Sequence, residues 1–184
     1  MFPDKNTFSP KKLLNRYRAV KAYTDGNAVN PAFPVELIIE ITSFCNLECI
    51  MCPRVNMKRN KQGYMEIELF RSIIDQIKDH VELVYLSGGL GEPLAHPRFG
   101  DMIRYCVSNN VRVGVSTNAT LLRPKQINEM LDASPDLVLL SLDGATKETH
   151  EAIRVGSVFE TTMGYVERFL EEKVRRGTEV VPVI

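Results

Sequence analysis

Two kinds of apolar pattern alternate along the chain from residue 35 onward. Apolar runs of strand length occur at Val35–Ile41, Leu83–Leu86, Val111–Val115, Leu137–Leu142 and Val180–Ile184. Segments with apolar residues at helical spacing lie between them, at Ile67–Ile77, Phe99–Val107, Ile127–Leu131 and Phe159–Val174. This alternation predicts right-handed crossovers and a parallel α/β sheet, either open and doubly wound or curved into a barrel. Because the strands are rich in Val, Ile and Leu without strict alternation, we expect both faces of the sheet to be covered.

The first 34 residues follow a different pattern. Lys11–Tyr23 predicts a short basic helix with its apolar residues along one side, and Thr24–Pro34 predicts a turn-rich linker. We therefore expect an N-terminal helix and linker over residues 1–30 and one α/β domain over residues 31–184. The chain stops inside an apolar strand. Because complete proteins usually protect such an edge, we expect the domain to be truncated and to continue beyond Ile184.

Composition and charge argue against several functional classes. Of the 184 residues, 44% are apolar and 25% are charged, as in a soluble globular domain. The formal net charge is zero, so nothing predicts nucleic-acid binding, and we expect the small basic cluster Lys58–Lys61 to be a solvated loop. No signal-peptide pattern and no apolar window of roughly 18 residues is present, which predicts a cytoplasmic protein without a membrane span. In that reducing compartment the four cysteines are not expected to form disulfides.

Chemically active side chains follow the predicted strands directly. Because ligands of parallel α/β folds bind at the C-terminal ends of the strands, we expect these segments to form one site. The segments are the cysteine-rich Thr42–Pro53, the glycine-rich Ser87–Pro93, Ser116–Asn118 and Ser141–Gly144.

Three of the four cysteines, Cys45, Cys49 and Cys52, lie within eight residues. One loop can place their thiols around a compact centre, and thiolates select zinc, copper(I) or iron–sulfur clusters. A structural zinc site usually needs a fourth ligand and a second Cys or His pair. Here Cys106 stands alone in an apolar helix and the three histidines are isolated. A cluster held by three thiolates would keep one iron open for a small molecule; zinc and a fortuitous grouping are the alternatives.

The glycine-rich turn is not a familiar phosphate loop. It lacks a Gly-Lys-Ser/Thr ending and does not open a long helix as a dinucleotide fingerprint does. Its glycines would let the backbone approach a ligand, and Glu92 could accept a hydrogen bond from a ligand ammonium group. A plain tight turn before Pro93 is the alternative.

Together these motifs resemble the radical S-adenosylmethionine (radical SAM) enzymes. The resemblance rests on Cys45-x-x-x-Cys49-x-x-Cys52 after the first strand and Gly91-Glu92-Pro93 after the second. It covers the chain from about Val35 to the end. Further details are similar to the branch that often carries a C-terminal SPASM or related auxiliary-cluster domain: Cys52-Pro53-Arg54, Ser116-Thr117-Asn118, Ser141-Leu142-Asp143-Gly144 and Arg154. The resemblance implies a partial (β/α)6 TIM-like barrel, of which this chain supplies about five strands.

The resemblance also implies cofactors and residue roles. Cys45, Cys49 and Cys52 would hold a 4Fe–4S cluster, whose open iron would take the amino and carboxylate groups of S-adenosylmethionine. The remaining predicted cofactor-binding residues are Met51 at the adenine, Gly89, Gly91 and Glu92 at the methionine ammonium, Ser116, Asn118 and Ser141 at the ribose or carboxylate, and Arg154 at the carboxylate. The reaction implied is reductive cleavage to a 5′-deoxyadenosyl radical that abstracts hydrogen from a peptide, protein or small-metabolite substrate. Reduced flavodoxin or ferredoxin is the implied electron donor.

One competing function and several plainer interpretations stand beside this reading. The competitor is a non-catalytic iron–sulfur or zinc-binding scaffold that serves electron transfer or assembly. Among single residues, Cys106 is expected to pack in the core, His96 to begin a turn or helix, and His80 to place a charge at a helix C-terminus. Asp143 is expected either to cap a helix from Thr146 or to lie beside the cofactor. Ala119 departs from the family pattern, in which a glycine often follows Thr-Asn.

Overall fold

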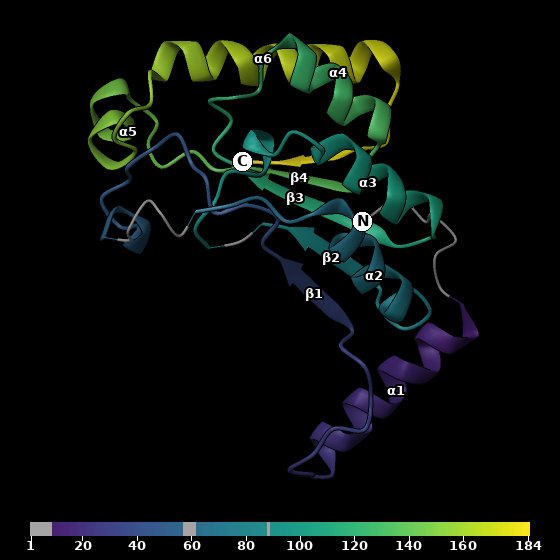
Figure 1. The fold of residues 1–184 in the computed structure, drawn as a ribbon. Helices are drawn as coiled ribbons and strands as arrows, with labels where there is room; N and C mark the ends of the chain where they lie inside the picture. Colours follow the sequence, from purple (N-terminus) through teal and green to yellow (C-terminus); the bar gives the residue numbers. More distant parts are fainter. Residues whose placement is uncertain (1–8, 57–61, 88) are drawn as a thin grey trace.

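Five parallel strands form a single sheet in the order β1-β2-β3-β4-β5. The computed structural model describes residues 9–56, 62–87 and 89–184 (Figure 1). The strands are β1 (Glu36–Ile39), β2 (Leu83–Leu86), β3 (Arg112–Thr117), β4 (Leu137–Leu140) and β5 (Val181–Val183). Each predicted apolar run overlaps an observed strand, and β3 extends two residues beyond its run, to Thr117. Consecutive strands pair in parallel, as the alternation with helices predicts.

Helices connect successive strands. They are α2 (Ile67–Ile77), α3 (Phe99–Ser108), α4 (Pro124–Ala133), α5 (Lys147–Ile153) and α6 (Phe159–Arg176), with short 3-10 turns at Pro53–Asn56 and Pro93–Ala95. The four predicted helices are confirmed. Helix α4 begins earlier than its apolar pattern indicates because Pro124 occupies its first turn, where the missing N–H costs nothing.

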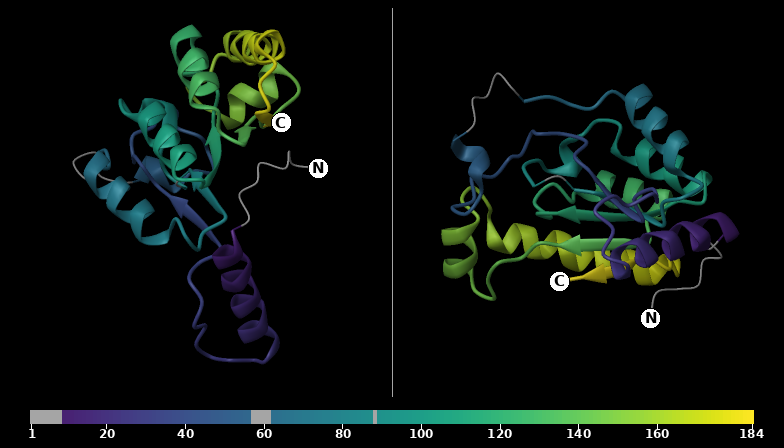
Figure 2. Two further views of the ribbon diagram at one scale, coloured as in Figure 1. Left: turned by 90° about the vertical axis from the view of Figure 1, so that its right-hand side faces the viewer. Right: turned by 90° about the horizontal axis from the view of Figure 1, so that it is seen from below.

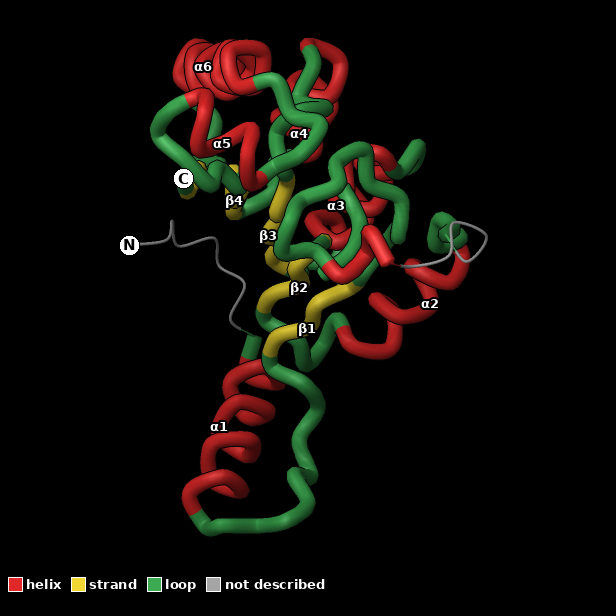
Figure 3. The backbone as a smooth tube through the Cα atoms, turned by 90° about the vertical axis from the view of Figure 1, so that its left-hand side faces the viewer, coloured by secondary structure: helices red, strands yellow, loops and turns green. Residues whose placement is uncertain are grey.

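The helices cover one side of the sheet. Figure 3 shows α2, α3, α4 and α6 on the same side of the strands. Strand β2 buries alternate residues accordingly: Val84 and Leu86 are fully buried, whereas Leu83 and Tyr85 are partly exposed. Of the two sheet types that the sequence allows, the structure is thus the partial barrel. Right-handed crossovers between strands whose order never reverses all pass over the same face of the sheet. The connecting helices therefore lie on one face, and not on both as we expected.

The hydrophobic core lies between the sheet and these helices. Phe70 and Ile74 of α2, Met102 of α3 and Phe169 of α6 are completely buried. Each such side chain contributes about 1.5–3 kcal/mol through its removal from water. Cys106 also packs here, fully buried, and burial raises the pKa of its thiol to about 12. Its predicted role as a core residue is confirmed.

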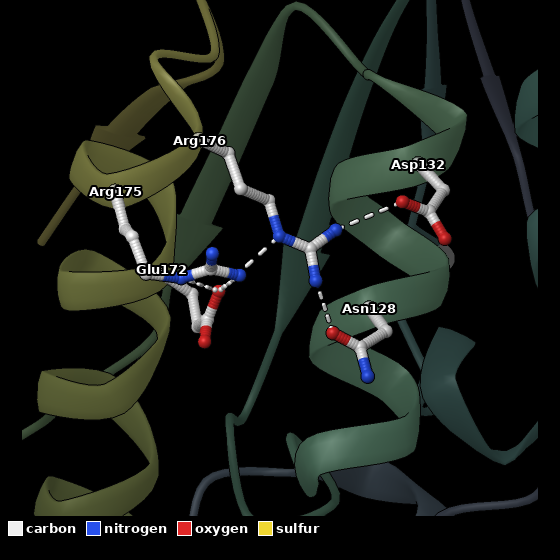
Figure 4. Close-up of polar contacts among 5 residues, drawn as sticks. All are labelled: Asn128, Asp132, Glu172, Arg175 and Arg176. Carbon is white, nitrogen blue, oxygen red and sulfur yellow. Dashed lines mark hydrogen bonds and ion pairs between the residues drawn. The ribbon is translucent and has the colours of Figure 1, made fainter.

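Ion pairs and hydrogen bonds fasten α6 to α4 on the outside of this layer. Arg176 of α6 donates to the Oδ1 of Asp132 at 2.8 Å and contacts the side-chain oxygen of Asn128, both on α4 (Figure 4). Its Nε also donates to Glu172 one turn earlier, at 3.2 Å. The arginine therefore bridges α4 and α6, the helices that precede strands β4 and β5.

Helix α1 (Pro10–Thr24) stands apart from this layer (Figure 2). The predicted helix is confirmed, but its apolar side does not pack against the domain: Leu13 is 51% exposed and Tyr17 is 62% exposed. Its buried residues are Lys12, Asn15 and Ala22. No helix of the described residues has the length and apolar character to cross a lipid bilayer.

Polar contacts attach α1 to the loops that precede the strands. The Nζ of Lys12 donates to the carbonyl of Asn110 at 2.6 Å. The side chain of Asn15 donates to the carbonyl of Phe33 at 3.0 Å and accepts from its N–H at 2.9 Å. The loops that precede the strands present backbone carbonyl and N–H groups, which need hydrogen-bond partners. The polar residues of the helix therefore face the domain.

Candidate cofactor site

The C-terminal ends of the strands surround one cavity of about 310 Å³. Every predicted site residue lines it: Cys45, Cys49, Met51, Cys52, Gly89, Gly91, Glu92, Ser116, Asn118, Ser141 and Arg154. Pro53, Ser87, Leu90 and Thr117 also contribute; Ser87 and Thr117 belong to the strand-end segments but had no role of their own in the sequence interpretation. Gly88 and the basic cluster Lys58–Lys61 lie outside the described residues.

The cysteine loop follows β1 and is tied to a distant segment. The N–H of Glu48 donates to Val155 at 2.9 Å, and the N–H of Ile50 donates to Ile153 at 3.0 Å. Both acceptors are carbonyls at the end of α5 and just beyond. The guanidinium group of Arg54 holds the same loop from within, at the carbonyl of Leu47. The three thiols are free, and the loop keeps them at one side of the cavity.

Burial dominates the electrostatics of two of these thiols. It raises the pKa of Cys45, while a hydrogen bond from the Leu47 N–H acts in the opposite direction. It also raises the pKa of Cys49, against the attraction of Arg154. Metal binding requires the thiolate form, so a bound cation would have to displace these protons.

The glycine turn packs tightly against the chain that leaves β1. A Cβ atom on Gly91 would lie 1.7 Å from the carbonyl oxygen of Thr42, a backbone atom that cannot move aside. The next residue, Glu92, donates its N–H to the carbonyl of Phe44 at 2.8 Å. A Cβ on Gly89, by contrast, meets no described atom within 4 Å. Gly91 is therefore needed for close packing, whereas Gly89 borders open space.

The Glu92 carboxylate joins this turn to the end of β3. It is only 2% exposed and accepts hydrogen bonds from the Thr117 hydroxyl at 2.6 Å, the Asn118 N–H at 2.8 Å and the Leu94 N–H at 3.0 Å. Burial raises the pKa of Glu92, and these hydrogen bonds counteract that shift. A carboxylate has about four acceptor positions, so one remains for a ligand. Thr117 is the partner that sequence reasoning missed, and only its place at a strand end pointed to it.

Hydroxyl and charged groups close the opposite side of the cavity. Ser116 of β3 and Ser141 after β4 bring their hydroxyl oxygens to 3.4 Å from each other. Arg154 follows α5 and donates its Nε to Asp143 at 2.6 Å. The role of helix cap expected for Asp143 is wrong, because Thr146 caps α5. Asp143 contacts Arg154, which lines the cavity, and a place beside the cofactor stays a prediction. Arg154 thus reaches the cavity already paired with one carboxylate.

Two histidines have structural positions. His96 begins the turn before α3, as predicted: its Nδ1 accepts from the Arg98 N–H at 3.0 Å, and its Nε2 meets the Met65 carbonyl at 3.0 Å. His80 does not close α2, because that helix ends at Ile77. It stacks on Phe33 instead, with 4.2 Å between ring centroids, so its expected role at a helix terminus is wrong.

Comparison with known proteins places this site in a family. The Radical SAM superfamily model matches residues 39–184. The tungsten-containing aldehyde ferredoxin oxidoreductase cofactor-modifying protein of Pyrococcus furiosus is 41% identical over 108 residues, which cover 58% of this chain and 30% of that protein. The mycofactocin maturase MftC of Mycobacterium tuberculosis is 33% identical over 121 residues, 66% of this chain and 30% of that protein. This chain therefore spans about a third of the length of these curated relatives.

A solved structure has a similar fold. The crystal structure of Streptococcus suis SuiB bound to S-adenosylmethionine superimposes with a TM-score of 0.69, at 20% identity, over 92% of this chain and 38% of that one. The family match covers most of the present sequence, including the cysteine loop, the glycine turn and all the strand ends that line the cavity. Membership implies S-adenosylmethionine and a 4Fe–4S cluster as cofactors. The chain belongs to the radical SAM superfamily.

Proposed function

We propose that this chain is the cofactor-binding part of a radical SAM enzyme. Cys45, Cys49 and Cys52 would hold a 4Fe–4S cluster, and S-adenosylmethionine would bind beside it in the same cavity. The observation that carries the proposal is that three thiols, a tightly packed glycine turn and the hydroxyl groups of two strand ends line one space. A non-catalytic scaffold has no need of such a set of polar groups next to its thiols.

The residues fit a cluster better than a single ion. Thiolates are the ligands that iron–sulfur clusters prefer. Across the described residues, no three His, Cys, Asp or Glu side chains converge closely enough to hold one metal ion. Three thiols that line one cavity together with the glycine turn support a larger centre with room for a second ligand. Zinc, which requires a compact tetrahedral set of ligands, is less well supported.

The polar residues suit the groups of S-adenosylmethionine. We assign the methionine ammonium to Gly89, Gly91 and the remaining acceptor position of Glu92. The adenine would lie against Met51, which is 56% exposed at the cavity.

The opposite side suits the other ends of the cofactor. Ser116 and Ser141 would contact the ribose or the carboxylate through hydroxyl groups that face each other. Arg154 would pair with the carboxylate while Asp143 holds its guanidinium group. Asn118, the remaining predicted residue at the ribose or carboxylate, has its side-chain amide already engaged and is considered below.

The chemistry supplied by the bound cofactors is one-electron cleavage of the sulfonium. One electron and S-adenosylmethionine give methionine and a 5′-deoxyadenosyl radical, which takes a hydrogen atom from the substrate and becomes 5′-deoxyadenosine. The chain's own residues bind and orient the cofactor and exclude water from the cavity. We propose a peptide, protein side chain or small metabolite as the substrate.

Several wider proposals follow from the same membership. The electron donor would be reduced flavodoxin or ferredoxin. The free cysteines suit a reducing, cytoplasmic location. We also propose the division into an N-terminal helix and linker, residues 1–30, and a partial barrel, residues 31–184, continued in the longer protein by a SPASM or related auxiliary-cluster domain.

Electron paramagnetic resonance tests the central proposal. The chain would be reconstituted anaerobically with iron and sulfide, reduced with dithionite and measured with and without S-adenosylmethionine. We expect the signal of a reduced 4Fe–4S cluster that changes shape when S-adenosylmethionine is added. A cluster signal indifferent to S-adenosylmethionine would favour the electron-transfer scaffold, and a colourless protein with bound zinc would overturn the cluster assignment.

Substitution of the thiols gives a matched test of the ligands. Cys49→Ala should lose most of the bound iron, because it removes one of the three thiolates. Cys106→Ala removes the same chemical group from the core, away from the cavity, and should retain wild-type iron content. Equal iron and sulfide content in the two variants would contradict the assignment of Cys49.

A further inference from the structure

A closed ring of hydrogen bonds lies beside Cys45. The side-chain amide of Asn118 donates to the Oδ1 of Asn46 at 3.2 Å, and the amide of Asn46 donates to the hydroxyl of Thr120 at 2.7 Å. The hydroxyl of Thr120 donates back to the Oδ1 of Asn118 at 2.6 Å. Each of the three side chains thus donates to one neighbour and accepts from the other, which fixes all three orientations.

The backbone removes any ambiguity about which way the Asn118 amide points. The N–H of Thr120 also meets the Oδ1 of Asn118, at 3.0 Å. A backbone N–H can only donate, so the atom that faces it must be the oxygen. The turn that makes this contact depends on Ala119, whose φ of 62° lies in the left-handed region. The NH2 group of Asn118 is therefore directed to the opposite side.

On that side lies the sulfur of Cys45. The Nδ2 of Asn118 is 3.7 Å from this Sγ, and Asn118 is only 5% exposed. An amide side chain has two donor hydrogens and two acceptor positions. In Asn118 the donors serve Asn46 and Cys45, and both acceptor positions serve Thr120. Its amide has no free position for a ribose hydroxyl or a carboxylate.

We propose that Asn118 is a positioning residue that acts through Cys45: it donates an N–H···S hydrogen bond to the cluster-ligating thiolate and makes the cluster easier to reduce. This inference rests on the proposed function. The reduced cluster carries one more negative charge than the oxidised cluster, so a donor dipole aimed at a ligating sulfur stabilises the reduced form more. The burial of Asn118 limits the screening of this dipole by water.

The midpoint reduction potential of the cluster measures this effect directly. It would be determined by redox titration of the reconstituted full chain, followed by electron paramagnetic resonance, without S-adenosylmethionine. Asn118→Ala removes the donor and should shift the potential to a more negative value. Thr120→Val keeps the shape of the side chain but breaks the ring, and should produce a smaller shift in the same direction. Thr120→Ser, unlike Thr120→Val, keeps the hydroxyl group and should keep the wild-type potential.

The outcomes separate the inference from the function on which it rests. A wild-type chain that binds no iron–sulfur cluster would overturn both. Wild-type and Asn118→Ala proteins with full cluster content and equal potentials would overturn the inference alone. If Asn118→Ala does not retain its cluster, the comparison of Thr120→Val with Thr120→Ser decides: equal potentials in that pair overturn the inference, and a more negative value for Thr120→Val supports it.

Discussion

Several residues of this site line the cavity and also fix the position of neighbouring segments, because the atoms that bind a cofactor must be held in place. Gly91 has no side chain at the point where the backbone of Thr42 passes close by. Glu92 links the same turn to β3 by accepting a hydrogen bond from Thr117. Ala119 occupies a left-handed position that favours glycine, which gives a physical reason for the glycine often seen there in the family. The departure at Ala119 is therefore accommodated within the turn that orients Asn118.

Gly91→Ala should disrupt this packing. The added Cβ would overlap the carbonyl oxygen of Thr42, so we expect a loss of about 3 kcal/mol or more in the free energy of unfolding, measured with urea. Gly89→Ala is the matched control, since no described atom lies within 4 Å of its added Cβ, and it should change stability by less than about 1 kcal/mol. Equal unfolding midpoints for the two variants would show that the turn is not close-packed.

His96 should make the stability sensitive to acid. Burial lowers its pKa, and its Nδ1 accepts from the Arg98 N–H, which a protonated ring could not do. The unfolded chain takes up a proton near pH 6.5 while the folded chain resists it, so the free energy of unfolding should fall as the pH drops below that value.

Urea unfolding at pH values from about 7.5 to about 5, which span the titration range of histidine, measures how the free energy of unfolding depends on pH. His96→Gln offers an uncharged acceptor for the Arg98 N–H and should have a shallower decline of stability with acid than the wild type. An unchanged slope would exclude His96 as a contributor.

At the scale of elements, four helices pack on the sheet through apolar side chains, whereas helix α1 is attached through polar contacts. The helices α2, α3, α4 and α6 bury apolar faces on the sheet, as their periodicity predicts. Helix α1 has an apolar side as well, yet the contacts that hold it are those of Lys12, Asn15 and Arg16 with loop groups. The amphipathic pattern thus predicts the helix correctly but not the side that faces the domain.

Asn15→Ala should release α1. Asn15 is 4% exposed and satisfies both the N–H and the carbonyl of Phe33, so its loss leaves buried polar groups without partners at a cost of about 1–3 kcal/mol. Hydrogen exchange should show faster exchange of the α1 amides. Leu14→Ala, in the same helix at a residue 48% exposed, should leave exchange close to that of the wild type. Similar exchange rates in both variants would contradict a polar attachment.

At the scale of the whole molecule, a one-sided barrel puts all strand ends on one rim. Each crossover brings the chain back to the same side, so the loops after β1, β2, β3 and β4 meet although they are far apart in sequence. Asn46 and Thr120, which share a hydrogen bond, are separated by 74 residues. The cavity is therefore a property of the topology.

The local features of this protein follow from its amino-acid sequence alone. Strands, helices and their parallel order follow from apolar periodicity, since that pattern reflects which residues each element can bury. The three clustered cysteines and the glycine turn identify the family because each motif lies within a short stretch of sequence. The same reasoning assembled the predicted site residues at the strand ends, which the structure brings into one cavity.

Only the tertiary structure decided how those residues are paired. The hydrogen bonds from Thr117 and Asn118 to Glu92, and those from Asn118 to Asn46 and Cys45, join segments distant in sequence. The polar contacts of α1 do so as well. Such contacts depend on angles and distances of a few ångströms set by packing, which periodicity does not encode. The covering of one face of the sheet has the same origin, because it depends on the order of the strands in the sheet, which only the folded chain shows.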